Sequence, residues 1–312
     1  MGNWKNRTKL VEGMIWLGLI LPIALYGRSV WLRSPRTPLP PEPIFQGILY
    51  KRIIETQPRP QVIHLFEIDL SDPTIQPFVT PSIENAPFID ENGQPRVTVA
   101  QRTASFLQHH NLQLAVNANF FYPFEEIAPW NYKPYEGDLS SVIGISISEG
   151  KQVSSMHPRY SSLCFLSQRA EIVWQQECPE DTQQAVSGHP LWLGDSPPPD
   201  DMMFVADKLK SAKAYPLTLA ALNAEGTRLW LLVSDGKQPL YSEGTTIKEA
   251  VDRLKALGAT TAVQLDGGGS TTAVIAADNG PQVLNAVIHA KVPGHERPVA
   301  NNLGFYAQPV QP

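Results

Sequence analysis

Val263-Gln264-Leu265-Asp266-Gly267-Gly268-Gly269-Ser270-Thr271-Thr272 joins a short apolar run to a carboxylate, three glycines and three hydroxyl side chains. We expect a buried strand over 261–265, which places the carboxylate at a strand end. Consecutive glycines let the backbone adopt positive φ and approach a ligand closely. Successive amides in such a turn form a concave anion site. The stretch therefore predicts an anion-binding loop beside a carboxylate. The alternative is a glycine-rich turn whose Asp bonds its own backbone.

Alternating apolar and polar residues around this stretch predict a strand-rich domain. A capping box from Thr246 to Glu249 begins a helix that ends at Gly258. Helical spacing predicts another helix over 98–109, with Thr98 as its N-cap. Strands are expected over 47–54, 62–70, 112–116, 142–147, 163–174 (as a hairpin), 215–222 and 229–233. The fold class is α+β: a strand-rich single domain with a large mixed sheet and a few helices.

The first 43 residues differ in composition from the rest. Lys5, Arg7 and Lys9 precede an uncharged, mostly apolar run over 13–27, which is typical of a signal peptide or signal anchor. No small-residue cleavage site follows, so we expect residues 1–33 to form a cytoplasmic stub and a transmembrane signal anchor. Five prolines within 34–43 favour an extended linker. Residues 44–312 then form the soluble domain, outside the cytosol.

The cysteines limit the cellular compartment in which the protein can work, and the net charge limits the class of its partners. Cys164 and Cys178 flank an apolar segment as residues on neighbouring strands do. A disulfide between them requires an oxidising compartment, and two buried thiols are the alternative. The formal net charge is −5, with no basic run beyond the N-terminus. This balance argues against nucleic acid as a partner.

Four segments follow one another along the chain: 116–121 (Val-Asn-Ala-Asn-Phe-Phe), 187–191 (Ser-Gly-His-Pro-Leu), 234–270 with its Asp-Gly-Gly-Gly-Ser end, and 296–304 with Arg-Pro-Val-Ala-Asn. Together they resemble the phosphodiester glycosidase family, over roughly residues 60–307. The resemblance implies a hydrolase that cleaves a sugar from a sugar-1-phosphodiester or a related envelope glycan. A non-catalytic glycan-binding or exopolysaccharide-assembly protein on the same fold is the alternative.

One position departs from the family's pattern. Members usually carry Pro-Arg-Thr where this chain has Pro216-Leu217-Thr218. An Arg can pair with a phosphate through two parallel hydrogen bonds, which a Leu cannot do. Either another cation (Arg297, Lys237 or Arg159) takes its place, or the substrate differs, or activity is reduced.

Two carboxylates and one guanidinium are the candidate catalytic groups. A phosphomonoester leaving group is already a stable anion, so the site should supply anion stabilisation and one well-placed carboxylate. Asp266 is the first candidate, as base or as stabiliser of an oxocarbenium-like centre. Asp235, at another strand end, is the second unless it is a turn residue. Arg297 offers a fork-shaped charge for phosphate, and its alternative is a salt bridge with Glu296.

Further groups are candidates for binding the substrate. They are Asn117, Asn119, His189, Gly267, Gly268, Gly269, Ser270, Thr271 and Asn301. The glycine amides and the two hydroxyls would cradle a phosphate. Asparagine amides suit sugar hydroxyls, but asparagine also bonds turn backbone. The histidine would be an acid near neutral pH, although family members often carry a small residue there.

No cofactor is expected. No cluster of His, Cys, Asp and Glu has zinc-ligand spacing. A divalent cation near Asp266 and Asp235 is chemically feasible but has no motif behind it. The expected partners are a carbohydrate or sugar phosphodiester, and a membrane through the N-terminal helix.

Overall fold

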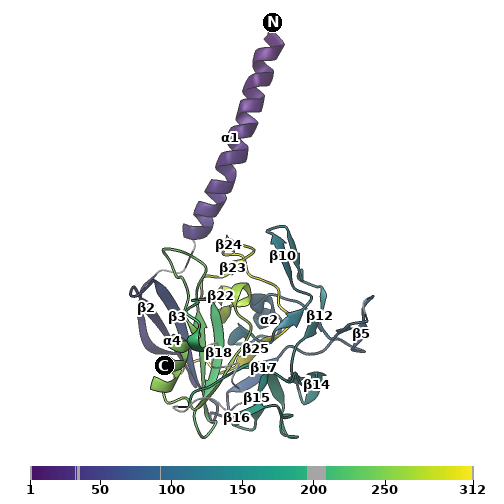
Figure 1. Ribbon diagram of the computed structural model, residues 1–312, viewed down its shortest axis with the longest axis vertical. Coiled ribbons are helices and arrows are strands. Elements are labelled where there is room, and N and C mark those ends of the chain that lie inside the picture. Colours follow the sequence, from purple (N-terminus) through teal and green to yellow (C-terminus); the bar gives the residue numbers. More distant parts are fainter. Residues whose placement is uncertain (1, 32, 34–35, 92, 195–208, 311–312) are drawn as a thin grey trace.

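A large antiparallel sheet dominates the computed structural model, which describes residues 2–31, 33, 36–91, 93–194 and 209–310 (Figure 1). Eleven strands form this sheet, in the order β1-β2-β3-β19-β18-β20-β17-β13-β14, with the β15–β16 hairpin attached to β17. The strands are β1 (Leu39–Phe45), β2 (Ile48–Glu55), β3 (Gln61–Asp69), β13 (Ser146–Ser148), β14 (Lys151–Ser154), β15 (Ser161–Leu166), β16 (Arg169–Trp174), β17 (Gln184–Leu191), β18 (Leu217–Leu222), β19 (Arg228–Ser234) and β20 (Thr261–Gln264).

A five-stranded sheet packs against one face of the large sheet. Its order is β22-β21-β8-β25-β4. The strands are β4 (Gln76–Val79), β8 (Leu114–Asn117), β21 (Ala273–Ala277), β22 (Gly280–Val283) and β25 (Asn302–Tyr306). Alternate residues of both sheets, such as Phe66, Val263 and Val116, meet in one buried cluster. The main core therefore lies between the two sheets.

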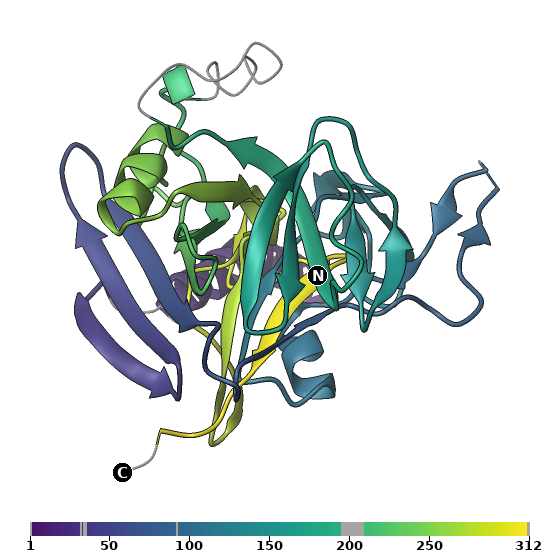
Figure 2. The same ribbon diagram turned by 90° about the horizontal axis from the view of Figure 1, so that it is seen from below.

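Two short helices cover the outer faces of these sheets (Figure 2). Helix α4 (Ile247–Ala256) buries Ala250, Val251 and Leu254 against the large sheet. Helix α2 (Thr103–His109) buries Phe106 and Leu107 against the five-stranded sheet. The domain is thus layered as helix, sheet, sheet and helix, and both apolar sheet faces are buried.

Several predicted elements are confirmed. The capping box is present, because Thr246 accepts from the Glu249 amide and the Glu249 side chain accepts from the Thr246 amide. The hairpins β15–β16 and β18–β19 form as expected. Cys164 and Cys178 form the disulfide, with their Cα atoms 5.8 Å apart.

Two predictions about the elements are wrong. The large sheet is not mixed, because every pairing within it is antiparallel. Helix α4 connects β19 to β20, and β20 pairs with β18 rather than with β19. Because β18 runs antiparallel to both of these strands, no parallel pairing arises. The helix expected over 98–109 begins only at Thr103, with Arg102 as its N-cap. Thr98 instead lies in strand β7 (Thr98–Val99), where it pairs with Ser140.

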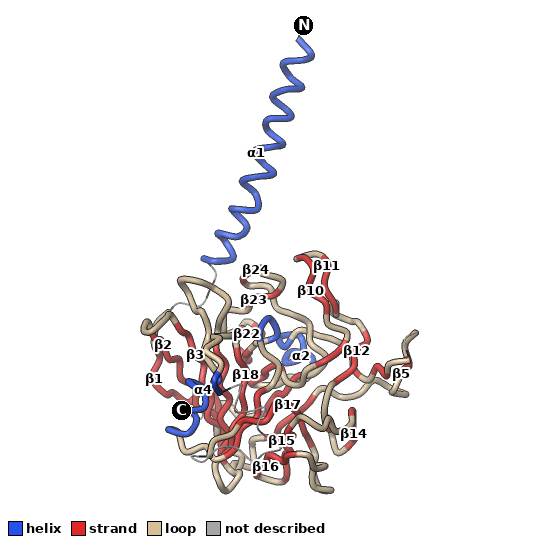
Figure 3. Tube along the Cα trace, viewed as in Figure 1, coloured by secondary structure: helices blue, strands red, loops and turns tan. Residues whose placement is uncertain are grey.

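The N-terminal region is a helix that projects from the domain. Helix α1 (Gly2–Trp31) stands clear of the sheets, and its C-terminal end lies near β24 (Val292–Pro293) (Figures 1 and 3). Among the described residues, no helix is both long enough and apolar enough to cross a membrane. The predicted transmembrane anchor is therefore not confirmed.

The expected linker, 34–43, contains residues 34 and 35, which lie outside the described part. Its later residues belong to β1, at the edge of the large sheet. An edge position accepts proline because the missing N–H faces no partner strand. The domain boundaries at residues 33 and 43 stay predictions.

Smaller pairings lie beside the two sheets. They are β7 and β9 (Phe121–Tyr122) with β12 (Leu139–Val142), β5 (Phe88–Ile89) with β6 (Pro95–Arg96), β10 (Glu125–Ala128) with β11 (Asn131–Lys133), and β23 (Ile288–His289) with β24. The β10–β11 and β23–β24 hairpins stand at the end of the domain from which α1 projects (Figure 3).

Candidate active site

The glycine-rich loop lies where three strands of the large sheet end together. Leu217 begins β18 opposite Ser234 at the end of β19, and Leu219 pairs with Gln264 at the end of β20. Asp266 lies two residues beyond Gln264, and its amide donates to the Ala118 carbonyl oxygen beyond β8. The loop therefore sits at a junction of both sheets.

The loop requires glycine for steric reasons. Gly268 has a φ of +66°, in the left-handed region that favours glycine. A Cβ on Gly269 would lie 2.4 Å from Nη2 of Arg297, and one on Gly267 would lie 2.8 Å from the Pro216 carbonyl oxygen. The missing side chains allow a guanidinium and a neighbouring strand to approach the loop closely.

Two of the three glycine amides are already bonded within the protein. The Gly267 amide donates to Asp266 Oδ1 at 2.8 Å, and the Gly268 amide donates to the Pro216 carbonyl oxygen at 2.9 Å. The carboxylate thus bonds its own backbone, as the turn alternative required. In this arrangement the loop does not present these two amides to a phosphate.

Asp266 remains the best-placed carboxylate. Its side chain is partly buried, and burial raises its pKa to about 6, against the opposing effects of a hydrogen bond with Ser270 and the charge of Arg297. The Lys237 ammonium also lowers this pKa, so that residue lies within electrostatic reach. An acid with this pKa changes protonation state near neutral pH.

Arg297 lies at the centre of the site and is almost fully buried, with 5% of its surface exposed. Its Nη1 donates to Ser270 Oγ at 3.1 Å, and its Nε donates to His289 Nδ1 at 3.1 Å. Its Nη2 forms an ion pair with Glu126. The Phe124 ring centroid lies 4.6 Å from the guanidinium carbon.

The salt bridge considered between Arg297 and Glu296 does not occur among the ion pairs of the described residues. Glu296 is instead buried, and it accepts the Ala104 amide at 2.9 Å in the first turn of α2. Burial raises the pKa of Glu296 to about 7. The Glu296 carboxylate therefore stabilises the first turn of α2 and does not pair with the Arg297 guanidinium.

Glu126 and His289 were not predicted from the sequence. Both contact Arg297, from the hairpins β10–β11 and β23–β24. Burial first, and then the charge of Arg297, lower the pKa of His289 to about 4, so its ring is neutral. The four residues 124–127 carry no motif, and only the fold brings them to the glycine-rich loop.

The three predicted asparagines are buried and bonded within the protein. Asn117 donates to the Asp266 carbonyl oxygen at 2.6 Å and accepts from the Thr218 hydroxyl at 2.8 Å. Asn119 donates to the carbonyl oxygens of Ile143 and Ile145. Asn301 donates to Ser146 Oγ at 3.1 Å. Their geometry favours positioning of the backbone, the alternative that the sequence left open, over contact with a sugar.

The second predicted carboxylate belongs to another network. Asp235 is fully buried; its Oδ2 lies 3.3 Å from His64 Nε2, and its Oδ1 accepts the Ala286 amide at 2.7 Å. The other ring nitrogen of His64 lies 2.8 Å from the Tyr50 hydroxyl. The structure places no contact between Asp235 and Asp266, so it does not join them as a catalytic pair.

His189 lies on the strand next to the glycine-rich loop, because it pairs with Gln264. Its ring contacts Phe120 and Tyr160, with centroid distances of 4.9 and 4.8 Å. The Asp266 charge contributes to raising the pKa of Tyr160 to about 12, although burial contributes more. Tyr160 is therefore within electrostatic reach of the Asp266 carboxylate, and it was not predicted from the sequence.

Leu217, where the family usually has Arg, points into the core. It is 2% exposed and belongs to the apolar cluster beneath α4, with Leu219 and Trp230. Thr218, the next residue along the strand, faces the other side and bonds Asn117. The Leu217 side chain thus lies on the face of the sheet opposite to the one on which Thr218 contacts Asn117.

Two other features of the described residues bear on the site. No group of three His, Cys, Asp or Glu side chains in that part of the chain could hold a metal ion.

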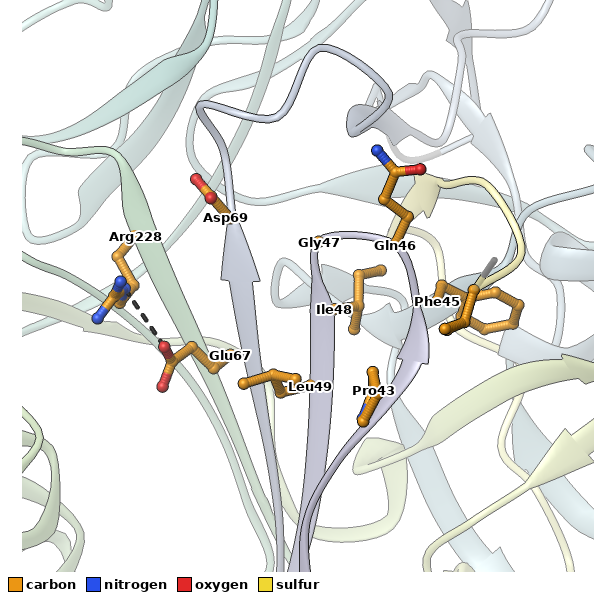
Figure 4. A pocket seen from close by; sticks show the side chains of 10 residues that line it. Pro43, Phe45, Gln46, Gly47, Ile48, Leu49, Glu67, Asp69 and Arg228 are labelled. Carbon is orange, nitrogen blue, oxygen red and sulfur yellow. Dashed lines mark ion pairs between the residues drawn. The ribbon is translucent and has the colours of Figure 1, made fainter. Parts of the chain in front are cut away.

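A surface pocket at the β1–β3 edge is lined by Gln46, Asp69 and Arg228, and the Glu67–Arg228 ion pair spans 3.3 Å there (Figure 4). This pocket contains none of the predicted site residues.

Comparison with protein families matches the phosphodiester glycosidase model over residues 110–306, more than half of the chain and all of the loop described above. The chain belongs to the phosphodiester glycosidase family. No functionally curated protein shows significant sequence similarity to it.

Solved structures share the fold of this phosphodiester glycosidase domain at low identity. The catalytic domain of zebrafish N-acetylglucosamine-1-phosphodiester alpha-N-acetylglucosaminidase, auto-inhibited by its pro-peptide, is 17% identical with a TM-score of 0.57, covering 86% of this chain and 85% of that one. A Burkholderia pseudomallei protein described as exported is 14% identical with a TM-score of 0.53, covering 79% and 74%. A hypothetical Synechocystis protein is 13% identical with a TM-score of 0.50, covering 84% of this chain but only 62% of its own length.

Proposed function

We propose that this protein is a hydrolase that cleaves the bond between a sugar and the phosphate of a sugar-1-phosphodiester. Membership of the phosphodiester glycosidase family supports the reaction class. The observation that carries the proposal is the connection from Asp266 through the Ser270 hydroxyl to the Arg297 guanidinium. A titratable carboxylate and a fixed positive charge are thereby held on two sides of one hydroxyl.

The geometry supports a division of labour between these groups. Arg297 would stabilise the negative charge of the phosphomonoester as it leaves with the electrons of the C1–O bond. Asp266 would accept a proton from the water whose oxygen adds to C1, or stabilise the positive charge on the sugar ring before that addition. Asn117 would act as a positioning residue, because it holds the Asp266 main chain. No step of this mechanism requires a cofactor.

The test is release of N-acetylglucosamine from UDP-N-acetylglucosamine or methylphospho-N-acetylglucosamine, extended to other sugar phosphodiesters. Wild type, Asp266→Asn and Asp278→Asn would be compared. Asp278 is an exposed carboxylate in the turn between β21 and β22, so it is a matched control. Turnover that disappears only in Asp266→Asn supports the proposal. If no member of the panel is cleaved while glycans still bind, the non-catalytic glycan-binding alternative replaces it.

We also propose that the domain works outside the cytosol. The Cys164–Cys178 disulfide supports this location, because such bonds persist in oxidising compartments. The structural similarity to a protein described as exported points the same way. Cell fractionation combined with thiol alkylation tests it: recovery in the cytosol with two reactive thiols would contradict the proposal. Attachment to a membrane through residues 1–33 stays a prediction that the same fractionation tests.

A further inference from the structure

The Arg297 guanidinium has a carboxylate where a phosphate would bind. All three of its nitrogens have partners: Nε has His289, Nη1 has Ser270 and Nη2 has Glu126. An Arg is always protonated in proteins, so a buried one requires a compensating anion. Glu126 supplies that anion in the present structure.

The three partners of Arg297 differ in how they are held. Ser270 and His289 are fully buried, at 0% exposure. The Glu126 side chain is 24% exposed, against 5% for that of Arg297. Its hairpin, β10–β11, forms a two-stranded sheet of its own and joins neither the eleven-stranded nor the five-stranded sheet. Glu126 is therefore the partner whose release disturbs the least packing.

The hairpin also carries exposed apolar side chains. Ile127 is 72% exposed and Trp130, in its turn, is 80% exposed. Neither residue belongs to a buried apolar cluster of the described chain. The hairpin contacts the site through Glu126 and through the Tyr132 ring, whose centroid lies 4.4 Å from that of His289.

Two buried polar atoms, one on His289 and one on the residue after Ser270, lack protein partners in the described part of the chain. They are Thr271 Oγ1 and His289 Nε2. Because His289 Nδ1 accepts from Arg297, the proton of the neutral ring is on Nε2, which is then a buried donor. Leaving such atoms unpaired is costly. A ligand with several oxygens, or water, would complete their bonding.

We infer that Glu126 occupies the position of a phosphoryl oxygen of the ligand, and that ligand phosphate replaces it at Arg297 while the β10–β11 hairpin moves away. This inference rests on the proposed function of the Arg297 site. Carboxylate and phosphate oxygens are equivalent acceptors for one guanidinium N–H. The apparent affinity for phosphate is then the intrinsic affinity multiplied by the fraction of molecules in which Glu126 has left Arg297.

The experiment is calorimetric titration of the full-length protein with inorganic phosphate, for wild type, Glu126→Gln and Glu125→Gln. Glu125 is the exposed neighbour on the same strand and has the same charge, so it controls for net charge and for the hairpin sequence. We expect Glu126→Gln to bind phosphate roughly tenfold more tightly than wild type, and Glu125→Gln to bind as wild type does. Equal or weaker binding by Glu126→Gln overturns the inference.

A measurement on wild type covers the case in which Glu126→Gln does not fold. Saturating phosphate should increase amide hydrogen exchange across residues 125–133, because the hairpin loses its contact with Arg297. Unchanged or slower exchange there overturns the inference. Neither readout depends on turnover. If Glu126→Gln binds phosphate tightly but cleaves no sugar phosphodiester, the proposed hydrolase activity is rejected. The replacement of Glu126 by phosphate at Arg297 is then still supported.

Discussion

The side-chain amide of Asn117 donates to the main-chain carbonyl oxygen of Asp266 over 2.6 Å, and so connects the five-stranded sheet to the loop after β20. The same side chain accepts from the Thr218 hydroxyl and the Thr272 amide, both of which are buried. One amide group therefore holds three segments together around the candidate carboxylate. Its position explains how two sheets from distant parts of the sequence fix one short loop.

Replacing this asparagine should reduce both stability and activity. Asn117→Ala leaves a buried hydroxyl and two main-chain groups unpaired, at a cost of about 2–4 kcal/mol. We expect a lower urea midpoint, and loss of turnover in the fraction that remains folded. Asn131→Ala, at an exposed asparagine in β11, serves as the control and should match wild type. An Asn117→Ala protein with wild-type stability would contradict this assignment.

Gly269 should tolerate no side chain. The Cβ of Gly269→Ala would lie 2.4 Å from Arg297 Nη2, so the guanidinium must move away from the loop and from its bond to Ser270. We expect weaker binding of phosphate and at least a tenfold fall in turnover. Gly280→Ala meets no atom within 4 Å; it should lose about 1–3 kcal/mol of stability through its positive φ and keep full activity. Equal activities of the two variants would rule out a steric role for Gly269.

The activity should depend on the protonation of Asp266. The mechanism uses the ionised carboxylate, and the pKa of Asp266 is raised to about 6. We therefore expect kcat/KM to fall as the pH drops through about 6. The Arg297 charge lowers this pKa, so Arg297→Gln should shift the fall to higher pH in its residual activity. A profile that stays flat from pH 4 to pH 8 would exclude Asp266 as the titrating base.

Glu296 should make the domain less stable as the pH rises. Its pKa is about 7 in the folded protein, against 4.5 for the unconstrained group. The folded state therefore binds more protons between these values, and stability is highest below pH 4.5 and declines up to pH 7. The shift corresponds to about 3 kcal/mol. Glu296→Gln keeps an acceptor for the Ala104 amide and should remove the share of Glu296 from this decline in urea unfolding curves, while the share of Asp266, whose pKa is raised to about 6, remains. A decline that persists unchanged would show another group to be responsible.

Restoring the family's usual Arg at position 217 should damage the protein. Leu217 is buried beneath α4, where a guanidinium would have no anionic partner among the cluster residues. We expect Leu217→Arg to cost about 3–5 kcal/mol without any gain in turnover. Leu217→Met keeps the volume and should cost less than about 1.5 kcal/mol. A stable and more active Leu217→Arg protein would show that the side chain can reach the site.

Local sequence patterns predicted most of the elements but not their partners. The alternation in β3, the apolar run of β19 and the capping box of α4 are properties of neighbouring residues, so they could be recognised in isolation. The antiparallel order depends on β20 pairing with β18 rather than β19, which no local pattern encodes. The early start predicted for α2 failed because Thr98 pairs with Ser140 in a strand, and this tertiary pairing overrides helical spacing.

The candidate site was predictable in part for the same reason. Asp266 and Arg297 stand in recognisable motifs, and the fold brings them together through Ser270. Glu126 and His289 could not be found, because they reach Arg297 from hairpins without a chemical signature. Asp235 looked equivalent to Asp266 in sequence, yet its register opposite β3 directs it to His64.

The prolines of β1 have a consequence for the behaviour of the protein at high concentration. Pro40, Pro41 and Pro43 lie in the outermost strand of the eleven-stranded sheet. A proline has no N–H to offer, so this strand is a poor template for the strand of a second molecule. The next strand of the sheet, β2, carries Ile48, Ile53 and Ile54. A chain shortened past residue 45 would expose that strand as a continuous, hydrogen-bonding edge, and the natural N-terminal segment thereby protects the folded protein against edge-to-edge aggregation.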